Sequence, residues 1–310
     1  MIERHGSHAA DHAAEHTAEH ASSSATTPPY RPDLAGREAA PLLRLVLVLT
    51  SGAAGFIGLL LYGGSLVASG PLDWFAWPVD RVTAVLLGAG FLGAVPMLLY
   101  SATRTLWEQL RVPALAAAAV VTGLSAVSVL DIGHTAVTSG ELTSPAFLLA
   151  VAWLLGVLGL TVGFVATLLL QATEPALPLA RTAPLPRPVL PLVALEGTAL
   201  LGLGFALLAE PSFWVPLLPW EATVFDGRMV GAWALALGVA LLGALAEDDL
   251  ARVRGGLLGV AGIGLLALAG LAAGPGIAWQ GWSGALGAVL LGGLSATGVV
   301  GLLLERRARS

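Results

Sequence analysis

The chain contains no cysteine and no lysine, and charged residues of either sign are rare. Its 310 residues include 15 basic ones, all of them arginine, and only 11% of the sequence is charged. Without cysteine there is no disulfide, no thiolate metal ligand and no cysteine nucleophile. Without lysine no Schiff base forms on a side chain, which excludes covalent attachment of pyridoxal phosphate or retinal.

Apolar residues dominate instead. Hydrophobic residues make up 56% of the sequence, and the mean hydropathy is +0.83, well outside the range of soluble globular domains. This composition predicts a membrane protein whose first partner is the lipid bilayer. The net charge of −5 argues against nucleic-acid binding. The bias toward alanine, glycine, leucine and arginine is typical of a GC-rich bacterial gene, so we expect the bacterial inner (plasma) membrane.

Eight apolar runs are long enough to cross a bilayer. A hydrocarbon core about 30 Å thick needs roughly 20 helical residues, and these runs lack the alternation of a membrane β-strand. They predict an all-α, polytopic transmembrane helix bundle with spans at 43–68, 81–101, 112–130, 146–170, 189–209, 228–246, 255–273 and 283–304. The first run begins near Leu42, so we expect the first span to act as an uncleaved anchor.

Arginines gather on one side of the predicted spans. Thirteen flank that side, and only Arg81 and Arg228 lie on the other. Because positively charged short loops stay in the cytoplasm, we expect cytoplasmic N- and C-termini. The opposite loops carry six tryptophans, which we interpret as an aromatic belt at the membrane interface, with a platform for lipid or sugar as the alternative. These residues are Trp74, Trp77, Trp214, Trp220, Trp279 and Trp282.

The sequence also resembles itself at an offset of 143 residues. Trp77 then falls on Trp220 and Arg111 on Arg254, so spans one to three match spans five to seven. This match predicts a parallel duplication of a four-helix unit, related by an axis along the membrane normal. The expected organisation is a disordered or marginally helical His-rich cytoplasmic tail at 1–41, a first unit at 42–172, a Pro-rich cytoplasmic linker at 173–188, a second unit at 189–304 and a basic cytoplasmic C-terminus at 305–310.

Few polar residues fall at membrane depth. Glu196 lies about two turns into the fifth span, where a carboxyl group is a candidate for transport unless it reaches the interface or pairs with Arg187. Asp131 and His134 are three apart and would share one face if the third span continued that far, as a proton relay or metal site. The glycine between them favours a helix end instead. Pro96 should kink the second span, either for packing or to line a cavity.

The tail preceding the first span has a regular histidine pattern. His8, His12, His16 and His20 recur every four residues, which places them in one stripe on a helix. Neutral imidazoles at this spacing bind Zn²⁺ or Ni²⁺, whereas the neighbouring carboxylates favour protonated imidazolium. A solvated tail with no specific ligand is the alternative.

The scarcity of buried polar groups favours a non-enzymatic structural or accessory membrane component that associates with other membrane subunits. A transporter with a path between the halves, using Glu196, is the alternative. A metal- or pH-responsive protein acting through the tail is a further one. An enzyme is disfavoured because no acid, base and nucleophile converge in the sequence, and we expect no cofactor in the spans.

Overall fold

The long helices follow the apolar runs of the sequence. The computed structural model describes residues 37–139, 141–173, 181–274 and 281–309. Eight helices there are long and apolar enough to cross a membrane, which confirms the predicted all-α polytopic bundle. They are α2 (Pro41–Val67), α3 (Arg81–Ala102), α4 (Trp107–Leu130), α5 (Pro145–Ala172), α6 (Leu190–Ala209), α8 (Val224–Glu247), α9 (Arg254–Ala273) and α10 (Trp282–Arg309). The protein is therefore an integral membrane protein.

Short helical turns occupy two of the connections. They are η2 (Ile132–His134) and η3 (Ala136–Thr138) after α4, and α7 (Pro211–Trp214) and η4 (Val215–Leu217) after α6. The long helices also extend beyond the apolar runs at three places. α4 begins at Trp107, α8 at Val224 and α10 continues to Arg309, because polar residues in a first or last turn do not end a helix.

Side-chain caps fix the start of several spans. The Asp80 carboxylate accepts a hydrogen bond from the Val82 amide at 2.8 Å and thereby caps α3. The Thr223 hydroxyl accepts one from the Asp226 amide at 3.0 Å and caps α8. Asp80 and Thr223 are 143 residues apart, which is the offset of the internal match. Both caps therefore occupy equivalent places in the two parts of the chain.

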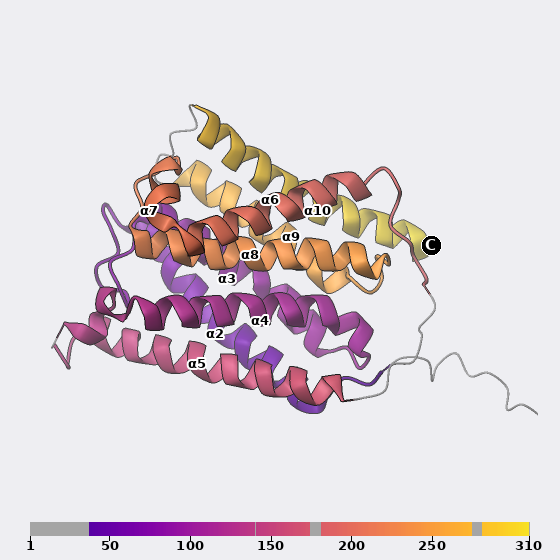
Figure 1. Cartoon of the computed structure of the whole chain (residues 1–310), viewed down its shortest axis with the longest axis horizontal. Coiled ribbons are helices and arrows are strands. Elements are labelled where there is room, and N and C mark those ends of the chain that lie inside the picture. The colour runs from indigo at the N-terminus through magenta and orange to yellow at the C-terminus, as the bar shows by residue number, and fades with distance from the viewer. Residues whose placement is uncertain (1–36, 140, 174–180, 275–280, 310) are drawn as a thin grey trace, which may run out of the picture. The chain divides into compact units, whose positions relative to one another are not determined.

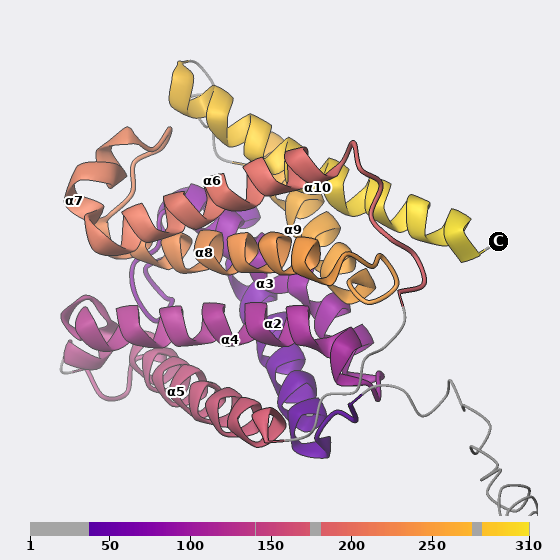
Figure 2. The same cartoon turned by 45° about the vertical axis from the view of Figure 1, so that its right-hand side comes forward.

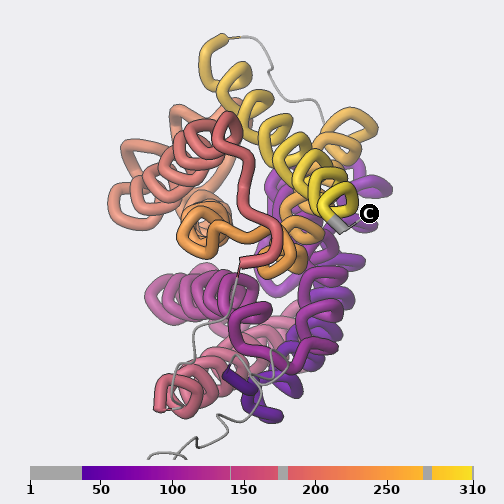
Figure 3. Tube along the Cα trace, turned by 90° about the vertical axis from the view of Figure 1, so that its right-hand side faces the viewer, coloured from indigo at the N-terminus to yellow at the C-terminus, as the bar shows by residue number. Residues whose placement is uncertain are grey.

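Four helices form the inside of the bundle and four surround them. Between 50% and 67% of the central stretch of α3, α4, α8 and α9 is buried, against 22% to 39% for α2, α5, α6 and α10. Figure 1 shows α6 and α10 along one side and α5 along the other, and Figure 3 shows the same separation end-on. The exposed sides of the outer helices are rich in leucine, valine and phenylalanine, as a lipid-facing surface requires.

The contacts between helices come in matched pairs. We call α2 to α5 the first half and α6 to α10 the second half. α2 packs along α3 as α6 packs along α8, and α4 meets α5 as α9 meets α10. Between the halves, α3 packs on α9 as α8 packs on α4. Each pair exchanges the equivalent helices of the two halves.

The two ends of the bundle differ in their side chains. Arg104, Arg111 and Arg254 lie at the start or end of spans on one side, which we call the Arg-rich end. Trp77 and Trp220 lie in connections on the other side, the Trp-rich end. This separation agrees with the alternation of connections along the chain.

Candidate functional site

Glu196 lies between α6 and α10 at the middle of a span. Its Oε2 accepts a hydrogen bond from the Thr297 hydroxyl at 2.9 Å, whereas its buried Oε1 has no partner among the described residues. A Cβ added to Gly293 would lie 2.6 Å from Oε1, so the carboxyl group packs directly against the α10 backbone. The structure thus gives Glu196 a hydroxyl of the neighbouring helix as its partner, in place of the arginine considered from sequence.

Asp131 and His134 lie together at the Trp-rich end but have separate partners. α4 ends at Leu130, and Asp131 forms a 2.5 Å ion pair with Arg228 of α8. The His134 ring stacks on Phe225 with 5.9 Å between ring centroids. These contacts tie the end of α4 to the start of α8, which is a structural arrangement and places no second ligand beside the imidazole.

Two tryptophans of the predicted aromatic belt join the halves. Trp77 is only 1% exposed, and its indole donates to Asp226 Oδ1 of the second half at 3.2 Å. Trp220 donates in the opposite sense to the Thr83 hydroxyl of the first half at 3.1 Å. Both the donors and the acceptors are 143 residues apart, so the two hydrogen bonds are equivalent under exchange of the halves.

The buried position of Trp77 differs from the interfacial one expected from sequence. Aromatic rings surround it, with the Phe75 and Phe225 centroids 4.9 and 5.2 Å from its own. Asp226 beneath it is fully buried, and its Oδ2 has no partner among the described side chains. Sequence reasoning missed Asp226 because a carboxylate in the first turn after a threonine cap has an ordinary local explanation.

The other tryptophans and Pro96 lie away from this contact. Trp74, Trp214 and Trp282 are exposed at the Trp-rich end, and Trp279 lies outside the described residues. Pro96 is inside α3 on its exposed face, away from the bundle interior.

Ion pairs concentrate at the Arg-rich end. Buried Glu247, at the end of α8, binds Arg111 of α4 with 2.5 Å between Oε1 and Nη2 and lies 3.6 Å from Arg252. Arg254, the repeat match of Arg111, pairs with buried Glu305 of α10 at 3.2 Å. Glu247 was not singled out from sequence, because the acidic run that contains it is typical of a solvated loop.

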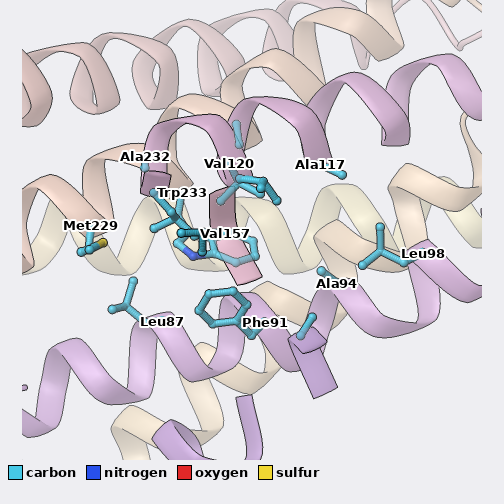
Figure 4. Packing of buried hydrophobic residues seen from close by; sticks show 14 of the residues in the cluster. Leu87, Phe91, Ala94, Leu98, Ala117, Val120, Val157, Met229, Ala232 and Trp233 are labelled. Atoms are coloured by element: carbon cyan, nitrogen blue, oxygen red, sulfur yellow. The ribbon is translucent and has the colours of Figure 1, made fainter. Parts of the chain in front are cut away.

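Two apolar cavities open beside the inner helices. The first, about 210 Å³, lies among α2, α3, α4 and α5, and the second, about 190 Å³, among α6, α8, α9 and α10. Trp233, Leu237 and Ile263 line both. Figure 4 shows Trp233 close to Phe91 and Val157, two further residues of the first cavity. Glu196 lines neither cavity.

The structure holds no evident metal centre in its described part. Among the described residues, no group of three histidine, aspartate or glutamate side chains is placed to hold a metal ion. His8, His12, His16 and His20 lie outside the described residues. Comparison with known protein families, curated proteins and solved structures finds no match to this chain.

Proposed function

We propose that this protein is a non-enzymatic structural or accessory membrane component, built from two four-helix units and assembled with other membrane subunits. The observation that supports this most is the character of the interior. Its cavities are lined by apolar side chains, and the mid-span carboxyl group of Glu196 is packed against Gly293 and Thr297 outside both. A pump for ions or polar solutes needs several polar groups along a hydrated path.

The duplication is part of the proposal. The matched helix contacts, the caps at Asp80 and Thr223 and the exchanged bonds of Trp77 and Trp220 all support it. Side-chain equivalences across an offset of 143 residues are hard to explain by composition alone. Each half has an even number of spans, so the halves run parallel and are related by an axis along the membrane normal.

The arginine distribution supports an orientation with both termini in the cytoplasm of a bacterial cell. The Trp-rich end then faces outward. A Ser139→Cys variant tests this, because Ser139 is exposed at that end and the natural chain has no cysteine. An impermeant maleimide should label this variant in intact cells. Labelling only after lysis would reverse the orientation.

A transporter is the second candidate, and the buried, unpartnered Oε1 of Glu196 favours it. An acidic group that lacks a partner at membrane depth is a common element of proton and cation pathways.

Flux through proteoliposomes separates the two candidates. We expect proton and sodium permeability equal to that of empty liposomes, for the wild type and for Glu196→Gln alike. A flux that Glu196→Gln abolishes would establish transport and overturn the accessory role. In mild detergent, an accessory component should also migrate as part of a complex larger than the 31.4 kDa chain. Migration as the isolated chain under conditions that preserve other complexes would count against assembly.

The histidine tail adds a separate regulatory hypothesis. The stripe of His8, His12, His16 and His20 is suited to Zn²⁺ or Ni²⁺, or to protonation in mild acid. Metal content of the full chain should fall when all four histidines are replaced by alanine. Equal content in both chains would leave the tail without a metal role.

A further inference from the structure

The cavity of the first half has an indole donor without an acceptor on its wall. Trp233 of α8 is 9% exposed and lines the cavity, and its buried Nε1 has no hydrogen-bond partner among the described residues. Other tryptophans of the core are satisfied, since Trp77 donates to Asp226 and Trp153 donates to Ser128 at 2.9 Å. An indole N–H removed from water without an acceptor costs about 1–3 kcal/mol. Trp233 is therefore set up to receive an acceptor from a bound molecule.

The surroundings of Trp233 keep its ring in place. Gly90 lies against the indole, where an added Cβ would come within 3.0 Å of ring atoms. The edge-to-face contact with Phe91 has 5.0 Å between centroids and an angle of 86°. Both neighbours come from α3, so a helix of the first half orients a tryptophan of the second. The absence of a side chain at position 90 is what allows this approach.

The cavity opens sideways between α2 and α5. These helices meet at the Arg-rich end, where the Ala40 amide donates to the Gln171 side chain at 2.9 Å, and they diverge beyond it (Figure 2). Phe56 of α2 is 57% exposed and Gly156 of α5 is exposed, and both line the cavity. Since both helices are membrane spans, a molecule that enters this opening comes from the bilayer.

The size and lining restrict what fits. An apolar protein cavity of about 150 Å³ binds benzene, so about 210 Å³ accommodates one six-membered ring with small substituents. Phe91, Trp153 and Trp233 present aromatic surfaces, which favour a planar ring. Among the lining side chains, the Thr50 hydroxyl is already used, because it donates to the Val46 carbonyl at 2.7 Å. The indole of Trp233 is the donor left for a ligand.

We propose that the first-half cavity binds a lipid-soluble molecule with a single planar ring that carries a carbonyl oxygen, such as a benzoquinone head group, with its hydrocarbon tail leaving between α2 and α5. The Trp233 indole donates to that carbonyl. This inference concerns binding alone, and it holds whether or not the protein assembles with other subunits.

Two probes that differ only in the acceptor test the indole contact. Decyl-1,4-benzoquinone and decylbenzene share a ring and a tail, and their retention by nanodiscs containing the full chain is measured against empty nanodiscs of the same lipid. We expect the wild type to retain the quinone more tightly. Trp233→Phe should weaken quinone binding about tenfold, the equivalent of one hydrogen bond, and leave decylbenzene binding unchanged. Equal retention of both probes by the wild type would overturn the proposal.

A pair of glycine variants locates the site. Gly156 lines the first cavity and Gly287 the second, and a side chain at either position meets no atom within 4 Å at its Cβ. Gly156→Leu should abolish quinone binding, whereas Gly287→Leu should leave it unchanged. Both variants should unfold at or above the wild-type temperature, which separates blocking from misfolding. Loss of binding in Gly287→Leu alone would place the ligand in the other cavity and refute the assignment.

A third probe distinguishes a ring from an ordinary lipid carbonyl. Methyl palmitate has an ester acceptor on an acyl chain and no ring. We expect it to bind more weakly than the quinone and without dependence on Trp233. If it binds equally well and is equally sensitive to Trp233→Phe, the cavity takes bilayer acyl esters, and the proposed ring is wrong.

Discussion

The two halves share a framework but differ where their first and last spans approach each other. Ala53 of the first half is the repeat match of Glu196. Ala53 lines a cavity that opens between α2 and α5. Glu196 instead binds Thr297 of α10, and the cavity of the second half lies toward the Trp-rich end beside Trp214 and Trp282.

This difference shows which parts of a repeated fold are constrained. The inner helices are buried against their counterparts, so a change in one half disturbs the other. The outer helices face lipid on most of their surface, where a change from alanine to glutamate alters only a local contact. We therefore expect variants of contacts between the halves to have larger effects than variants of contacts within the second half.

The largest effect should come from the ion pairs that join the halves at the Arg-rich end. Glu247→Gln removes the charge that faces Arg111 and Arg252, and the Glu247 side chain is only 1% exposed. We expect a loss of about 2–4 kcal/mol in unfolding free energy, toward the lower value because the Arg111 side chain is 44% exposed. Unfolding in mixed micelles measures it.

Asp248→Asn is the matched control. Asp248 pairs with Arg181, whose side chain is 60% exposed, and asparagine tolerates the left-handed backbone at this position, where φ is 47°. A loss below about 1 kcal/mol is expected. Similar losses for both variants would mean that burial of Glu247 contributes nothing.

The exchanged tryptophan bonds should come next. Trp77→Phe leaves the fully buried Asp226 without its indole donor, and we expect a loss of about 2 kcal/mol in unfolding free energy. Trp220→Phe removes a bond to the neutral Thr83 hydroxyl from a half-buried ring, and about 1 kcal/mol is expected. A larger loss for Trp220→Phe would contradict the assigned asymmetry. The same micelle unfolding assay compares them.

Close approach of α3 and α9 gives a third comparison. A Cβ at Gly93 would lie 2.6 Å from the Ile263 Cα, so Gly93→Ala should lower the melting temperature, at a cost of about 1–3 kcal/mol. Gly52 on α2 has no atom within 4 Å of an added Cβ. Gly52→Ala should be neutral or stabilising by up to about 1 kcal/mol. Destabilisation by both would show that helix flexibility, and not the contact between halves, is being measured.

The smallest effect should be at Glu196. Thr297→Val removes the hydroxyl that donates to its carboxyl group, and hydrogen bonds between membrane helices contribute about 0.6 kcal/mol on average. Ser295→Ala is the control, since the Ser295 hydroxyl donates within its own helix to Leu291. A loss above about 2 kcal/mol for Thr297→Val would make Glu196 a central element of the fold.

Much of the fold follows from the sequence, because lipid leaves few alternatives to a helix of about 20 apolar residues. The runs predicted all eight spans, and a Trp and an Arg at a common offset were enough to suggest the duplication. Helix ends were less predictable. Trp107 and Glu108 begin α4 although they are outside the apolar run, since the first turn tolerates polar residues.

The partners of the candidate residues were beyond sequence reasoning. Asp131 pairs with Arg228, which is 97 residues away, and Glu196 with Thr297, 101 residues away. No local spacing encodes such contacts. Trp233 had no signal at all, because a tryptophan within an apolar run has a packing explanation, and only the surrounding structure shows that its N–H lacks an acceptor.

Water access to the carboxyl group of Glu196 tests the central claim, a closed bundle without a polar path, most directly. In the naturally cysteine-free chain, a Thr297→Cys variant places one thiol beside Glu196, and a maleimide reacts with the thiolate, which forms in water. The account predicts no labelling in proteoliposomes under conditions that label Ser139→Cys completely. Labelling of Thr297→Cys at a comparable rate would reveal a hydrated path to Glu196 and contradict the account.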